Sequence, residues 1–177
     1  MKQTDFLVNR ELRIYRSAQT RQHWPKRAER VQAIVEVAYP ILKDMLDFDP
    51  GISIRIAGLK AKNVRGTYNH QDKVATIDYR IMNDWTILEV LCHELVHAEQ
   101  YHQGRLQNIW DTRSRSWRFE WSGEKTNKGT TYRAYRKQPH EIEAFSRQTA
   151  LAKEVVVKMG LADPLQFLLW STTGNSL

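Results

Sequence analysis

Two histidines stand four residues apart in this sequence, and a glutamate follows the first of them: His93, Glu94, Leu95, Val96 and His97. Residues four apart on a helix share one face, about 5 to 6 Å apart, so both imidazoles can bind one zinc ion. Glu94 can then reach a water molecule on the zinc and accept its proton, which prepares that water to attack a carbonyl carbon. The motif therefore predicts a catalytic zinc site with His93 and His97 as ligands and Glu94 as general base.

A catalytic zinc ion of this kind needs a third protein ligand. The apolar residues of the segment 144–155 recur every three or four positions, and this spacing places Glu141 on the buried face of the same helix. A carboxylate on a buried face is costly unless it is paired or binds a metal ion. Glu141 is therefore the expected third ligand, with His140 and Glu143 as alternatives. Glu143 also stands four residues before Arg147, the spacing of a solvated ion pair.

The surrounding chain must bring these residues together, and its pattern predicts three helices and several strands. The expected helices cover 25–45, 85–102 and 139–159, and the expected strands cover 52–56, 63–68 and 73–79. Pro40 should kink or split the first helix. The last two strands flank a polar turn and should form a hairpin that leads into the helix with the histidines. The second and third helices therefore have to pack together if they are to share a metal ion.

A chain of 177 residues with 41% apolar residues is sufficient for one domain with a single core. We expect this domain to cover 1–177. Its expected parts are a core of about 52–158, an N-terminal helical region at 1–51, an aromatic and basic insertion at 105–138, and a C-terminal cover at 160–177.

The insertion at 105–138 alternates aromatic with basic residues, and its two ends join the helices that carry the expected ligands. Its side chains should therefore line the substrate cleft. Ser122 and Gly123 are expected to turn the chain between a strand at 117–121 and a return segment near Tyr132. We expect most of the aromatic side chains to pack on the core, with solvated arginines. Binding of nucleic acid through phosphate contacts and base stacking is possible but not favoured.

Tyr132 and Tyr135 in this insertion are candidates for donating a hydrogen bond to the oxyanion that forms during hydrolysis. The alternative is a structural role for both tyrosines, because a buried tyrosine usually serves packing.

The net charge of +7 is concentrated in one stretch, because residues 101–140 hold 9 basic and 3 acidic side chains. This basicity favours acidic protein segments or nucleic-acid-associated substrates at the rim of the cleft. Cys92 is the only cysteine, which excludes an intrachain disulfide and favours a reducing, cytoplasmic setting. The sequence has neither a signal-peptide core nor an apolar stretch long enough for a membrane span, so we expect no membrane association.

The two motifs together, His93–His97 and then Glu141–Ala144, resemble the two-histidine, one-glutamate site of gluzincin-type metallopeptidases. A hairpin that leads directly into the first motif is similar to the minimal zincin domains of the SprT-like and ImmA/IrrE-like families, which are common in bacteria and bacteriophages. The resemblance covers about residues 52–158. It implies an α+β, zincin-like fold, in which a small antiparallel or mixed sheet packs on the helix with the first motif and on a second ligand-bearing helix.

The same resemblance implies a zinc-dependent endopeptidase that cleaves a protein or peptide substrate. His93, His97 and Glu141 would be its zinc ligands and Glu94 its general base. The alternative is a non-catalytic zinc-containing protein that binds DNA or a regulatory partner.

Overall fold

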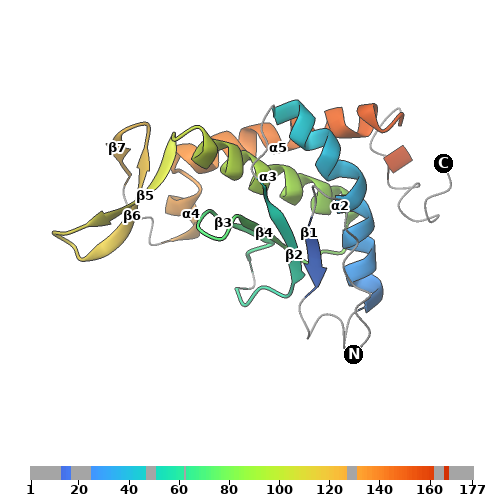
Figure 1. Cartoon of the computed structure of the whole chain (residues 1–177), viewed down its shortest axis with the longest axis horizontal. Helices are drawn as coiled ribbons and strands as arrows, with labels where there is room; N and C mark the ends of the chain where they lie inside the picture. Colours follow the sequence, from blue (N-terminus) through green and yellow to red (C-terminus); the bar gives the residue numbers. More distant parts are fainter. Residues whose placement is uncertain are drawn as a thin grey trace.

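The computed structural model describes residues 13–16, 25–46, 51–61, 63–126, 131–161 and 166–167, and these form a mixed α+β structure (Figure 1). The strands are β1 (Arg13–Arg16), β2 (Ser53–Ala57), β3 (Gly66–Asn69), β4 (Val74–Asp78), β5 (Leu106–Asp111), β6 (Ser116–Trp121) and β7 (Glu124–Lys125). The helices are α2 (Pro25–Leu46), α3 (Asp84–His102), α4 (Tyr132–Tyr135) and α5 (Pro139–Lys158). The expected α+β class is therefore confirmed.

The larger sheet is mixed and has the strand order β1-β2-β4-β3. β2 pairs in parallel with β1 and β4, and β3 pairs antiparallel with β4. The predicted hairpin is confirmed as β3–β4, and Asn69 stabilises its turn by accepting a hydrogen bond from the backbone N–H of Gln71 at 2.9 Å. β3 is left at the edge of the sheet and lies along α3, with Gly66 next to Val90 and Glu94 and the ring of Tyr68 5.9 Å from that of Tyr101.

The three long helices, α2, α3 and α5, lie on one side of this sheet. Among the described elements, α3 contacts a larger number of other elements than any other does. In Figure 1, α3 and α5 run side by side along the long axis of the molecule. The N-cap of α3 is Asn83, whose side chain accepts a hydrogen bond from the backbone N–H of Thr86 at 3.0 Å. The core lies between the sheet and the helices and includes Ile54, Ile56, Ile77, Leu88, Leu91 and Leu95.

In the N-terminal half, α2 runs from Pro25 to Leu46 with Pro40 inside it, so of the two effects expected of this proline, a kink or a split, the split does not occur. The buried residues Ala38, Tyr39 and Leu42 flank this exposed proline and hold the helix on the core. The N-terminal region, expected to be helical, also contributes β1, because its backbone pairs with β2, which side-chain periodicity does not reveal.

Parts of the predicted regions lie outside the described residues. These parts are 1–12, 17–24 and 47–50 of the N-terminal region, 62 of the core, 127–130 of the insertion, and 162–165 and 168–177 of the C-terminal cover. None of the helices that the structure does describe is long and apolar enough to cross a membrane.

The insertion forms a second sheet of three antiparallel strands, β5-β6-β7, which projects from one end of the molecule (Figure 1). The predicted turn at Ser122 and Gly123 is present, and both residues have positive φ, 49° and 86°. The prediction of a return segment near Tyr132 is wrong. The chain returns along β6 as β7, and Tyr132–Tyr135 form the helix α4. Thr131 starts this helix by accepting a hydrogen bond from the backbone N–H of Ala134 at 3.2 Å.

Candidate metal centre

Three side chains from two helices meet at one point, because α3 packs along α5. His93 and His97 lie one turn apart on α3, and Glu141 lies in the first turn of α5. The two Nε2 atoms are 3.1 Å apart, and the Glu141 carboxylate oxygens lie 3.4 Å from Nε2 of His93 and 3.2 Å from Nε2 of His97. The three residues expected as ligands are thus brought together, and all three are buried.

Two glutamine side chains orient the imidazoles. Nδ1 of His97 lies 2.9 Å from Oε1 of Gln100, and Nδ1 of His93 lies 3.0 Å from Oε1 of Gln148. Gln100 also donates through Nε2 to the backbone carbonyl of His140 at 3.0 Å, which fixes the direction of its amide. An amide oxygen only accepts, so Nδ1 of His97 carries a proton, and in the neutral imidazole Nε2 therefore presents a lone pair toward the centre.

This arrangement favours a cation at the centre. Lone pairs of two imidazoles and one carboxylate converge within 3.4 Å of one another, and they repel unless positive charge lies among them. Ligand atoms at about 2.0 to 2.1 Å from a tetrahedral zinc ion are about 3.3 Å apart, close to the three observed separations. The residues therefore fit a zinc ion, with one tetrahedral position left over for water or substrate.

The Glu141 carboxylate is prepared to stay ionised. Burial alone would raise its pKa, but its interactions with His93, His97 and Tyr135 outweigh burial and hold the pKa well below the usual value. The same carboxylate helps to raise the pKa of His97 against the effect of burial. The centre thus has a buried, ionised carboxylate that attracts a cation.

Glu94 lies beside the three ligands and lines the same cleft, with 4% of its surface exposed. Burial raises the pKa of its carboxyl, and the neighbouring imidazoles only partly counter this effect. β3 passes directly over it at Gly66: a Cβ on that glycine would lie 2.5 Å from Oε1 of Glu94 and 2.6 Å from Cγ1 of Val90. Gly66 thus leaves the space that the Glu94 carboxylate occupies.

The two alternative third ligands take other positions. Glu143 accepts hydrogen bonds from Arg147 at 2.8 Å and from Arg105 at 3.0 Å, and both arginines also pair with Glu99 on α3. The predicted Glu143–Arg147 pair is therefore present, but as part of a network between α3 and α5 rather than as an isolated surface pair. His140 is buried against the rings of Phe119 and Trp121. Burial lowers the pKa of His140 to about 4, so it is neutral at pH 7.

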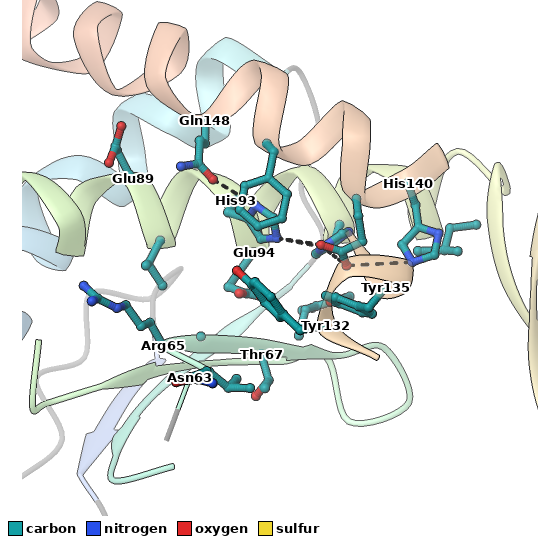
Figure 2. Close-up of a pocket in the computed structure, with 18 of the residues that line it drawn as sticks. Asn63, Arg65, Thr67, Glu89, His93, Glu94, Tyr132, Tyr135, His140 and Gln148 are labelled. Atoms are coloured by element: carbon teal, nitrogen blue, oxygen red, sulfur yellow. Dashed lines mark hydrogen bonds and ion pairs between the residues drawn. The ribbon is translucent and has the colours of Figure 1, made fainter. Parts of the chain in front are cut away.

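A cleft of about 700 Å³ opens onto the centre between α3, α5 and β3. Tyr132 and Tyr135 of α4 line it (Figure 2), and the hydroxyl of Tyr135 donates a hydrogen bond to the Glu141 carboxylate. Burial and the neighbouring Glu141 raise the pKa of Tyr135, so its hydroxyl keeps its proton at neutral pH. Leu106 of β5 and Phe119 of β6 form the wall on the side of the insertion, as expected for a segment tied to both ligand helices.

The aromatic residues of the insertion divide into two groups. Phe119 and Trp121 pack inward on His140, as expected. Trp110 and Trp117 do not pack on the core: they are 51% and 55% exposed and face each other across β5 and β6, with ring centroids 5.5 Å apart. The hairpin that holds them projects from the domain, so the core is out of their reach (Figure 1).

Several residues of the site do not stand out in the sequence motif. Gln100 and Gln148 were visible only as amides on helix faces that carry the ligands, seven residues after His93 and Glu141 respectively. Gly66 gave no signal, since its role depends on how closely β3 approaches α3. Cys92, next to the first ligand, is a buried thiol in the core, and burial raises its pKa.

Comparison of the chain with protein-family models, with curated proteins and with solved structures gives no match. The geometry of the site is therefore the basis for any statement about function.

Proposed function

We propose that this protein is a zinc-dependent endopeptidase with a zincin-like fold and that its substrate is a protein or peptide. The observation that carries the proposal is the convergence of His93, His97 and Glu141 beside the buried carboxylate of Glu94, at the floor of a cleft. A metal centre next to a base of raised pKa is the arrangement that hydrolysis of a peptide bond requires.

Each residue would have a defined role. His93, His97 and Glu141 would hold the zinc ion, whose chemistry is to polarise the scissile carbonyl and to lower the pKa of a water ligand to about 7. Glu94 would accept the proton of the attacking water and pass it to the leaving amine. Tyr135, and Tyr132 beside it, would donate a hydrogen bond to the oxyanion, for which the raised pKa of Tyr135 keeps the needed proton in place.

The position of β3 supports a substrate that binds in an extended conformation. β3 is an edge strand of the described sheet and lines the cleft with Gly66, Thr67 and Tyr68. The outer backbone groups of an edge strand can pair with an extended peptide. A cytoplasmic setting agrees with this proposal, because Cys92 would stay reduced there.

The test compares wild type with Glu94→Gln, which keeps the shape of the side chain and removes the base. We expect equal zinc content in the two proteins and a loss of cleavage of an unfolded protein by at least about 100-fold in the variant. Zinc content is measured by atomic absorption and cleavage by gel electrophoresis. Zinc without turnover in wild type would exclude the peptidase.

The ligand set is tested in the same preparation. Glu141→Ala should lose zinc, whereas His140→Ala and Glu143→Ala should keep it. Retention of zinc by Glu141→Ala, together with its loss in either of the other two variants, would move the third ligand to that residue.

The exposed pair Trp110 and Trp117 supports a second candidate, a binding protein for single-stranded nucleic acid. Arg113 and Arg115 lie beside the pair in the exposed turn of the hairpin, so phosphate contacts and base stacking could occur on one surface. The test is the fluorescence anisotropy of a labelled single-stranded oligonucleotide at two salt concentrations. Anisotropy that stays at the free value at low salt would exclude this candidate.

A further inference from the structure

The shell around the candidate metal centre contains neutral amides where zinc-bound histidines often have carboxylates. Each Nδ1 contacts an amide oxygen, of Gln100 for His97 and of Gln148 for His93, at 2.9 and 3.0 Å. A carboxylate partner makes a bound imidazole more basic, whereas an amide orients the ring without adding charge. The choice of partner therefore affects the charge of the whole centre.

The charges around the centre balance for a divalent ion. Glu94 and Glu141 are its two buried carboxylates, 4% and 1% exposed. Around it, Glu99 and Glu143 are paired with Arg105 and Arg147, and the two further charged residues that line the cleft, Glu89 and Arg65, have opposite signs. A divalent cation would thus bring the buried charge to zero, whereas a carboxylate in place of either glutamine would leave an uncompensated negative charge in a buried site.

The two glutamines differ in how firmly they are held. Gln100 has no exposed surface and is bound at both ends, to Nδ1 of His97 and to the carbonyl of His140, so it also joins α3 to the first turn of α5. Gln148 is half-buried, lines the cleft, and contacts Nδ1 of His93 through its amide oxygen (Figure 2). Gln148 can therefore be changed with little effect on the helix packing.

We propose that Gln100 and Gln148 are positioning residues, which hold Nε2 of both histidines toward the ion and keep the loaded centre electrically neutral. The proposal rests on the proposed function for the identity of the ion. These two residues, which are not ligands themselves, would then affect both the zinc affinity and the net charge of the centre.

The experiment uses two substitutions of Gln148 with different charge. Gln148→Met has nearly the same shape but accepts only weakly, so zinc affinity should fall about 10- to 100-fold. Gln148→Glu supplies a charged acceptor, so it should bind zinc about 10-fold more tightly and yet cleave substrate more slowly, because the added charge opposes polarisation of the carbonyl. Zinc affinity is measured by competition with a chromophoric chelator, and the ligand geometry by the absorption spectrum of the cobalt-substituted protein.

The matched controls are Gln107→Met and Gln107→Glu on the exposed surface of β5, which should leave affinity and spectrum unchanged. The thermal midpoint of the metal-free Gln148 variants should stay within a few degrees of wild type, which separates positioning from folding. Affinities and cobalt spectra equal to wild type in both Gln148 variants would overturn the proposal.

The outcome also separates this proposal from the peptidase. Wild type that binds zinc without cleaving would exclude the peptidase, and the order of zinc affinities would still decide the role of Gln148. Wild type that binds and cleaves, with Gln148 variants that match it, would exclude only the positioning role. Wild type that binds no zinc would overturn both.

Discussion

At the scale of single residues, the site depends on one side chain that is missing. Gly66 brings the backbone of β3 close to Glu94 and Val90, and any larger residue there would meet both. The glycine is therefore needed for the position of Glu94, the proposed base, rather than for flexibility of the strand. Sequence patterns describe side chains that are present, so this requirement becomes visible only from the structure.

Gly66→Ala is expected to lower peptide cleavage about 10-fold or more while zinc content stays at the wild-type level. The added Cβ would displace the Glu94 carboxylate, from which it would be 2.5 Å away, and the three atoms nearest to it belong to Glu94 and Val90 rather than to the expected metal ligands. The measurement is the turnover number together with zinc content. The double variant Gly66→Ala/Val90→Ala, which frees space next to the strand, should recover part of the activity; full activity in Gly66→Ala alone would contradict this reading.

At the scale of elements, the connection between the large sheet and α3 is held by Asp78 at the end of β4. Its carboxylate accepts hydrogen bonds from the backbone N–H of Leu59 at 3.1 Å and of Arg80 at 2.8 Å, and it pairs with the Arg80 guanidinium. Burial would raise the pKa of Asp78, but the side-chain and backbone bonds from Arg80 and the bond from Leu59 outweigh burial and lower it. This side chain fixes the path by which β4 leads into α3.

Asp78→Asn should reduce the free energy of unfolding by about 1 to 3 kcal/mol at pH 7. Because the folded-state pKa lies below the unfolded value of about 3.9, the ionised carboxylate stabilises the fold above that pH. This contribution is lost as the pH falls below about 4, so the difference between variant and wild type should shrink there. Urea denaturation between pH 7 and pH 3 measures it, with the exposed Asp44→Asn as control. A difference that does not change with pH would contradict the role of the charge.

Much of this element order can be predicted, and the exceptions have a common cause. α3, α5 and the β3–β4 hairpin follow from local periodicity and turn residues, which act over a few positions. β1 depends on pairing with β2 about 40 residues further along the chain, and the β5–β6 hairpin lies in a segment without clean alternation. For the site, the His93–His97 motif is local, and the position of Glu141 follows from one buried helix face. The contacts of Gln100, Gln148 and Gly66 depend on packing between elements.

At the scale of the whole molecule, the described chain divides into a domain that holds the core and a projecting ribbon, which consists of β5, β6 and β7. The ribbon contributes Leu106 to the buried hydrophobic residues, whereas the described core is built from α2, α3, α5 and the larger sheet. Its distal part, from Ile109 to Arg118, should therefore add little to the stability of the fold.

Replacement of Ile109–Arg118 by Asn-Gly should give a folded protein that still binds zinc. Asn108 and Phe119 are paired across β5 and β6, so a two-residue turn can join them and keep Phe119 in the cleft wall. We expect a thermal midpoint within about 5 °C of wild type. Calorimetry and zinc content check this expectation. A chain that fails to fold would mean that the ribbon belongs to the folding unit.

The register of β5 and β6 also sets the distance between the exposed tryptophan pair and the cleft. Trp110 and Trp117 lie only two positions beyond Asn108 and Phe119, and two residues of a strand span about 7 Å. Any chain that rests on the tryptophan pair therefore needs no more than two or three further residues to enter the cleft. One short segment of a bound chain can therefore contact the tryptophan pair and, a few residues further on, place a peptide bond at the candidate metal centre.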